Sequence, residues 1–152
     1  MKLVTKLFGE IEISEEKIIT FGNGIIGFPD LKKFTLVYDE ENQGAAISWL
    51  QSLDEPAFAI PVMNPLLIKE SYDPFIDDEL LKPLGEITPE NSYVLVTVTV
   101  PKEIKELSVN LKAPIVINVD EKKGSQIIVE DNFPVKYLIY DILESQKKEG
   151  GK

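Results

Sequence analysis

The chain has 152 residues, with 26 Asp and Glu against 16 basic residues, a formal net charge of -10, and no histidine or cysteine. All of its basic residues are lysines, so it also lacks arginine. This composition excludes imidazole acid–base chemistry, thiolate nucleophiles, disulfides, and metal sites built from histidine or cysteine.

Short runs with β-strand character, separated by turn residues, occupy most of the chain. The clearest run is Tyr93 to Val100, in which seven of eight residues are β-branched or aromatic. Pro56 and Pro61 confine the apolar run from Ala57 to Val62 to a sheet edge or a bend. In chain order the predicted strands are 2–8, 10–13, 17–21, 34–38, 45–50, 57–62, 92–100, 115–119, 126–130 and 135–143, the last of which is alternatively a short helix towards its end.

Two further local features complete the predicted fold. Asp77 to Lys82 predicts a helix of one or two turns, because carboxylates favour a first helical turn and Pro83 and Gly85 stop it. Gly124 is expected to supply a positive φ in the hairpin that joins the strands at 115–119 and 126–130. We therefore expect a mainly all-β, compact antiparallel β-barrel-like domain of about ten short strands with one short helix.

The predicted domain covers residues 1–143, and the polar, glycine-ended residues 144–152 are expected to form a flexible tail. No run of apolar residues is long enough to cross a membrane, and the N-terminus has no apolar signal-peptide core. The expectation is a cytoplasmic protein, monomeric when free, that does not bind membranes. Because nucleic-acid binders carry a basic patch or stripe, we expect no direct nucleic-acid binding, whereas an acidic chain suits a basic protein partner.

The run Gly22-Asn-Gly24-Ile-Ile-Gly27 matches the G-x-G-x-x-G pattern of dinucleotide-binding proteins. That pattern requires a helix to follow within a βαβ unit, but here the next predicted strand begins near Phe34. The run is better interpreted as a loop that needs positive φ or close backbone approach. Its apolar members either plug an end of the barrel or form an exposed partner surface; they are Ile25, Ile26, Phe28 and Leu31.

The acidic cluster Asp73, Asp77, Asp78 and Glu79 is the best candidate for acid–base or metal chemistry. Glycoside hydrolysis needs only two carboxylates, so a carboxylate-only glycan hydrolase that uses Asp73 or Asp78 stays open. The spacing does not fit a calcium-binding EF-hand loop, and negative charge at a helix start has a structural reason of its own. Trp49, the only tryptophan, is a core residue or a docking residue.

Five stretches of the sequence form an ordered set of blocks. The first two are GIIGFPDLKKF, from Gly24 to Phe34, and WLQSLDEPAFA, from Trp49 to Ala59. Further blocks follow: Asn64-Pro65 with Tyr72, the VTVP of Val98 to Pro101, and the VNLKAPIVIN of Val109 to Asn118, with Gln126 after it. Together these blocks resemble the flagellar assembly factor family FliW. The first is similar to its glycine-rich opening, with a departure at Asp30, and the second to its W-L-Q-S-L segment.

The resemblance implies a compact β-barrel-like fold with no catalysis and no cofactor. It implies binding to CsrA, a basic RNA-binding translational repressor, which relieves repression of flagellin messenger RNA. It also implies binding to flagellin, which releases CsrA. A generic β-barrel interaction module with an unrelated partner is the remaining alternative. The residues expected to contact partners are Ile26, Phe28, Trp49, Asp73, Asp77, Asp78 and Asn110.

Overall fold

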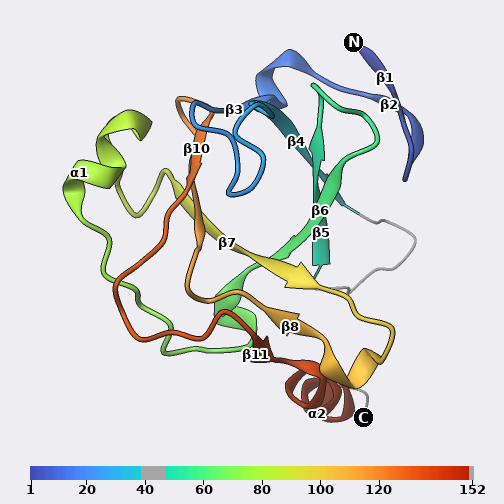
Figure 1. The fold of residues 1–152 in the computed structure, drawn as a ribbon, viewed down its shortest axis with the longest axis vertical. Coiled ribbons are helices and arrows are strands. Elements are labelled where there is room, and N and C mark those ends of the chain that lie inside the picture. Colours follow the sequence, from blue (N-terminus) through green and yellow to red (C-terminus); the bar gives the residue numbers. More distant parts are fainter. Residues whose placement is uncertain (39–46, 151–152) are drawn as a thin grey trace.

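The structure is a computed structural model that describes residues 1–38 and 47–150, with side chains in the last helix described as far as Gln146. It is mostly β, and seven of its strands form a closed barrel (Figure 1). Around the ring these strands are β3 (Ile19–Phe21), β4 (Lys33–Tyr38), β5 (Ile47–Ser52), β6 (Ala59–Met63), β7 (Ser92–Thr99), β9 (Ile115–Asn118) and β10 (Lys123–Gln126). The predicted all-β barrel is thus confirmed.

One pairing departs from the expected antiparallel arrangement. β10 runs parallel to β3, with Lys123 opposite Thr20 and Gly124 opposite Phe21, while the other ring pairings are antiparallel. β7 pairs with both β6 and β9, and this double pairing closes the ring. A local sequence pattern cannot predict a parallel pairing between segments about 100 residues apart, so the predicted arrangement contained antiparallel pairs only.

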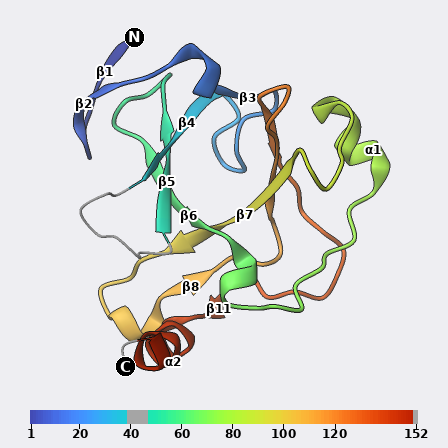
Figure 2. The same ribbon diagram turned by 180° about the vertical axis from the view of Figure 1, so that it is seen from behind.

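The remaining elements lie outside the ring. β1 (Lys2–Thr5) and β2 (Gly9–Glu12) form a separate hairpin, and β8 (Ser108–Val109) and β11 (Tyr137–Leu138) extend the sheet beyond β7. The helices are α1 (Asp78–Leu81) and α2 (Tyr140–Gly150), with 3-10 turns at Glu15–Lys17, Pro65–Leu67, Lys82–Leu84 and Ile104–Glu106. α1 lies at one side of the barrel, and α2 lies beside β8 and β11 (Figures 1 and 2).

Inward-facing strand residues fill the barrel. Phe21, Phe34, Leu50 and Ile115 are fully buried there, and the rings of Phe21 and Phe34 meet edge to face with centroids 5.3 Å apart. Alternation along each strand explains this burial, since every second side chain points to the interior. A second core lies between β7, β8, β11 and α2, and a third, small one lies beneath α1.

The hairpin between β9 and β10 differs from its prediction. The turn occupies residues 119–122, so β10 starts at Lys123 and not at the predicted residue 126. The positive φ, 58°, belongs to Lys122 and not to Gly124. Gly124 lies within β10, where an added Cβ would come within 2.5 Å of the Phe21 ring. The glycine is therefore required by the close approach of an aromatic ring.

Pro61 occupies a strand that pairs on both sides, yet it leaves no ladder bond unmade. It lies opposite Trp49 in β5, three positions along from the pair in which Ser52 N–H donates to Phe58 O at 3.0 Å. By the alternation of antiparallel pairs, Pro61 is in a non-hydrogen-bonded pair, so its missing N–H would face away from β5. On that other side, pairing with β7 begins only at Val62. At Pro61, β6 is therefore paired on the β5 side only, so the edge position predicted from the prolines occurs locally, in a strand that has a neighbour on both sides further along.

The C-terminal region is a short strand followed by a helix. The run predicted over 135–143 contains β11 and the start of α2, in which Ile142 and Leu143 pack on the second core. This packing against the second core stabilises α2, since most helices in proteins are stabilised by tertiary contacts. The predicted strand over 45–50 is observed as β5 from Ile47, and residues 45–46 lie outside the described residues. The flexible tail predicted for 144–152 overlaps α2, and the domain boundary at residue 143 stays a prediction.

Replacing Gly124 by alanine should destabilise the fold by about 1–3 kcal/mol, because the added methyl overpacks against Phe21. Gly22→Ala is the matched control, since an added Cβ there would meet nothing within 4 Å and the φ of Gly22 is not in the left-handed region. Urea unfolding monitored by circular dichroism measures both changes. Equal stability of the two variants would contradict the role assigned to Gly124.

Candidate partner-binding surface

The long connection between β6 and β7, residues 64–91, carries the acidic cluster, and we call it the outer segment. Its first part is fixed by two polar contacts to the connections that precede β9 and follow β10. The Tyr72 hydroxyl donates to Leu111 O at 2.6 Å, and Phe75 N–H donates to an Asp131 carboxylate oxygen at 3.1 Å. Burial, and then the nearby Asp131, raises the pKa of Tyr72 to about 12. The buried phenol is therefore held in its neutral, hydrogen-donating form.

The last part of the outer segment is held by asparagine side chains. Asn118, buried at the end of β9, donates from Nδ2 to Leu84 O at 2.8 Å and to Glu86 O at 3.2 Å. Asn91 donates from Nδ2 to the same Glu86 carbonyl at 2.7 Å. The buried Leu84 side chain packs with Val116 in the third core. Both ends of the segment are therefore fixed, and its middle is presented to solvent.

α1 begins as its carboxylates predicted. Asp77 is the N-cap residue, and its side chain accepts from Glu79 N–H at 3.0 Å. Glu79 forms an ion pair with Lys82 at 2.8 Å. Asp73 and Asp78 are exposed and form no ion pair with the described side chains. Negative charge therefore remains unneutralised on this face.

Phe75 lies within this acidic stretch and is 74% exposed, which makes it a candidate that sequence reasoning missed. Leu80 on α1 is 48% exposed. An exposed aromatic side chain ringed by charge is typical of a docking residue. The signal for Phe75 was present in the run Tyr-Asp-Pro-Phe-Ile-Asp-Asp, which has no strand or helix period to bury it. We call the set Asp73, Phe75, Asp77, Asp78 and Leu80 the acidic ridge.

A hollow of about 330 Å³ borders the acidic ridge and is lined in part by Asp73, Ile76 and Tyr93. Asp73 is the only carboxylate among the described residues that line it. Glycosidases need two carboxyl groups facing one cleft. The hydrolase hypothesis therefore lacks its second carboxylate at this hollow.

The glycine-rich loop after β3 is part core and part surface. Ile25 and Phe28 close a tight turn through two backbone hydrogen bonds, of 2.7 and 3.2 Å. Ile25 is buried in the barrel core, whereas Ile26 and Phe28 are 49% and 44% exposed. The ring of Phe28 packs against that of Phe58, with the ring centroids 4.4 Å apart. Ile26 N–H donates to the side-chain oxygen of Gln126 at 3.0 Å. Of the two interpretations made from the sequence, the plug at the barrel end applies to Ile25, and the exposed surface applies to Ile26 and Phe28.

This loop also lacks the setting of a dinucleotide site. No helix follows Gly27, because the chain turns at Phe28 to Asp30 and enters β4 at Lys33. Gly24, with φ 67°, has Phe28 O and the Pro29 backbone so close that a Cβ would overlap them. Gly24 therefore serves the turn itself.

Trp49 and Asn110 are occupied by contacts within the chain. Trp49 is half-buried, and the Phe8 ring from the β1–β2 hairpin meets it edge to face at 6.0 Å. The Asn110 side chain accepts from Lys112 N–H at 2.9 Å and from Ala113 N–H at 3.2 Å. This is the turn-forming role that asparagine commonly has.

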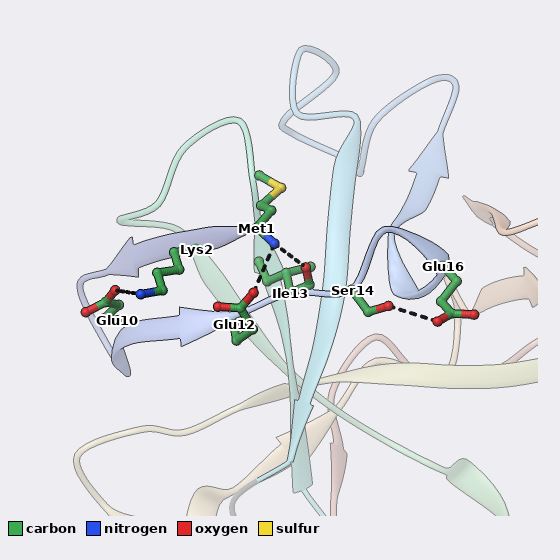
Figure 3. Close-up of polar contacts among 7 residues, drawn as sticks. All are labelled: Met1, Lys2, Glu10, Glu12, Ile13, Ser14 and Glu16. Atoms are coloured by element: carbon green, nitrogen blue, oxygen red, sulfur yellow. Dashed lines mark hydrogen bonds and ion pairs between the residues drawn. The ribbon is translucent and has the colours of Figure 1, made fainter.

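The β1–β2 hairpin, whose Phe8 ring packs on Trp49, also carries exposed ion pairs. The Met1 ammonium lies 3.1 Å from a Glu12 oxygen and donates to Ile13 O, and Lys2 pairs with Glu10 at 3.9 Å (Figure 3). Exposed pairs of this kind contribute little to stability. Packing of Phe8 on Trp49 is therefore the main apolar contact that we identify for the hairpin.

The structure brings some predicted contact residues together and separates others. Asp73, Asp77 and Asp78 share the outer segment, and Ile26 and Phe28 share the loop after β3. Strand β5, which carries Trp49, and helix α1 lie on different sides of the barrel (Figures 1 and 2). The described residues include no group of three or more Asp or Glu placed to hold a metal ion. Within the same residues, no helix is long and apolar enough to cross a membrane.

Comparison with known proteins gives consistent matches along the chain. The model of the family described as FliW protein matches residues 2–139. Flagellar assembly factor FliW of Lachnospira eligens is 52% identical over 150 residues, covering 97% of this chain and 99% of that protein. The corresponding protein of Lachnoclostridium phytofermentans is 48% identical over 155 residues, covering 100% of this chain and 99% of its own length. A crystal structure of the flagellar assembly factor FliW superposes with a TM-score of 0.83 at 33% identity, covering 92% of this chain and 97% of that one.

The Tyr72 contact predicts a stability change at alkaline pH. Unfolded tyrosine titrates near pH ~10, and the folded state keeps its proton up to about 12. The contribution of Tyr72 to the free energy of unfolding should therefore be complete below pH ~10 and fall as the pH rises towards ~12. Tyr72→Phe should lose about 1 kcal/mol at neutral pH, through the unmade bond to Leu111 O, and show a shallower alkaline decline.

Urea unfolding between neutral pH and pH ~11 measures this difference. Tyr137→Phe is the control, because its hydroxyl has no hydrogen-bond partner within the described part of the chain. The same alkaline slope in wild type and Tyr72→Phe would count against the assignment.

Proposed function

The chain belongs to the FliW family, and we propose that it is a non-catalytic regulator that binds CsrA and flagellin in the cytoplasm. Binding of CsrA relieves its repression of flagellin messenger RNA, and binding of flagellin releases CsrA. The protein itself contacts neither RNA nor membrane and is monomeric when free. The observation that best supports CsrA binding is the acidic ridge, whose carboxylates form no ion pair among the described residues and lie beside an exposed aromatic side chain.

The charge of the ridge suits a basic, RNA-binding partner. The whole chain carries a net charge of -10, so its long-range field attracts a cationic protein. At close range, an opposite-charge contact at ~4 Å near a protein surface is worth about 4 kcal/mol before desolvation and screening. Carboxylates placed on CsrA also add negative potential near its RNA-binding surface. RNA, which is itself anionic, is then disfavoured there.

Apolar contacts add to this charge. Phe75 is 74% exposed and lies between the carboxylates, so burying it against a partner would remove a large apolar surface from water. Its backbone N–H is bonded to Asp131, which limits the movement of the chain at this position. A pre-positioned aromatic residue loses little conformational freedom on binding. Phe75 is thus the proposed anchor, with Asp73, Asp77 and Asp78 around it.

The second partner suits a different surface. Flagellin has amphipathic terminal segments, and Ile26 and Phe28 present exposed apolar side chains on the loop after β3. If flagellin weakens CsrA binding by some factor, CsrA must weaken flagellin binding by the same factor. Trp49 and Asn110 stay predicted contact residues, although their observed contacts are within the chain itself.

The central test mixes purified protein, CsrA and a flagellin leader RNA. Saturating protein should lower the affinity of CsrA for the RNA, and added flagellin should restore it. Electrophoretic mobility shift or fluorescence anisotropy of labelled RNA measures both steps. An unchanged CsrA–RNA affinity at saturating protein would overturn the proposal and favour an interaction module with an unrelated partner.

Neutralising the ridge should weaken CsrA binding. The triple change Asp73→Asn, Asp77→Asn and Asp78→Asn keeps the helix cap, because asparagine caps as well as aspartate does. We expect a 10- to 100-fold rise in the Kd for CsrA, roughly 1.4–2.8 kcal/mol, and a weaker dependence on salt. Phe75→Ala should raise the Kd about 10-fold with the salt dependence unchanged.

The matched control removes the same charge elsewhere, through Glu103→Gln, Glu106→Gln and Asp141→Asn. These exposed side chains lie on α2 and at the 3-10 turn Ile104–Glu106, which contacts α2. Isothermal titration calorimetry with CsrA at two salt concentrations compares the variants. If the control variant bound CsrA as weakly as the ridge variant, only net charge would matter, and the assignment of the ridge as the CsrA-binding surface would be wrong.

A further inference from the structure

A groove of about 260 Å³ opens on the barrel between the start of β3, the second half of β4 and the end of β9. Its apolar floor is formed by Ile19, Leu36 and Ile117, which belong to or pack on the barrel core. The acidic ridge contributes none of its residues to this lining. We call it the barrel-mouth groove, and it is a surface to which the proposed function assigns no role.

The rim of the groove consists of aromatic and aliphatic side chains that remain exposed. Tyr38 is 60% exposed and Val119 is 44% exposed. Tyr93 also lines the groove, and the pKa of Tyr38 is raised by burial and then by Tyr93, which places the two phenols close together. Tyrosines with an apolar face and a polar tip are enriched where proteins dock.

The charges of the groove are opposite to those of the chain as a whole. Lys17 and Lys122 line it, and no described carboxylate does. Neither lysine forms an ion pair with any other side chain that the structure describes. Of the carboxylates adjacent in sequence, Glu16 accepts a hydrogen bond from Ser14 (Figure 3), and the Glu121 carboxylate lies against Gly85.

The size of the groove indicates what it can hold. Sites for small organic ligands are commonly ~300–1,000 Å³, and this groove is smaller and open. It therefore suits one or two side chains of a peptide more than a cofactor. An acidic peptide would be repelled by most of a surface with a net charge of -10, so the two lysines make the groove its favoured place.

We propose that the barrel-mouth groove binds a peptide segment of a protein partner in which aliphatic side chains flank a carboxylate. An aliphatic side chain lies on the floor of Ile19, Leu36 and Ile117. The carboxylate pairs with Lys17 or Lys122, and the phenols of Tyr38 and Tyr93 hydrogen-bond to the peptide backbone. The inference rests on the groove alone and does not depend on CsrA binding at the acidic ridge.

The test uses three capped peptides and the full chain. They are acetyl-Ser-Leu-Glu-Leu-Ser-amide, its Glu-to-Gln analogue, and its analogue with both leucines changed to alanine. In ¹⁵N-labelled protein, the first peptide should shift the amide signals of Ile19, Leu36 and Ile117. The Gln peptide should bind about fivefold more weakly, and the alanine peptide should give no shifts.

The variant Lys17→Gln with Lys122→Gln should bind the Glu and Gln peptides equally. The control Lys102→Gln with Lys105→Gln removes the same charge from exposed lysines and should keep the fivefold preference. Shifts confined to other residues, no binding of the first peptide, or an unchanged preference in the Lys17/Lys122 variant would each overturn the inference. The CsrA–RNA competition is measured separately, so failure of the groove and failure of the proposed function are distinguishable.

Discussion

The parallel contact between β3 and β10 is the constraint on which the rest of the structure depends. It consists of two residue pairs, and it is the only parallel pairing in the described barrel. It is possible because Gly124 leaves room for the Phe21 ring in the interior. With this contact made, seven strands enclose one apolar core and leave no unpaired edge within the ring. The hairpin of β9 and β10 is thereby fixed in place.

That hairpin in turn supports the proposed functional surface. Asn118, at the end of β9, donates to the carbonyls of Leu84 and Glu86. Outside the hairpin, in the connection that leads from β8 to β9, Leu111 O accepts from the Tyr72 hydroxyl. The outer segment therefore takes its position from the closed barrel, although its own residues are mostly exposed. Folding and partner recognition use different atoms of the segment. Its carbonyls and buried side chains fix it, and its carboxylates remain available.

Local patterns in the sequence predicted the parts of the fold that local physics determines. Strand β7 was evident from its β-branched residues, and Asp77 was evident as a helix start. The parallel pairing was not predictable, because residues 20 and 123 meet only through the closure of the whole ring. The reason for Gly124 was likewise hidden, since a close-packed glycine and a positive-φ glycine look the same in a sequence. The carboxylates of the candidate site are visible as an acidic cluster in the sequence, and their role stays a prediction, whereas the exposure of Phe75 is a tertiary property.

The contact between Phe8 and Trp49 has a spectroscopic consequence. Trp49 is the only tryptophan in the chain, so intrinsic tryptophan fluorescence has a single source. That source reports on the seating of the β1–β2 hairpin, whose Phe8 ring lies 6.0 Å away. Neither the acidic ridge nor the barrel-mouth groove includes Trp49. A partner that changes this emission therefore signals contact with Trp49 or the hairpin, or displacement of the hairpin, and a partner that binds without changing it leaves that side of the barrel as it was.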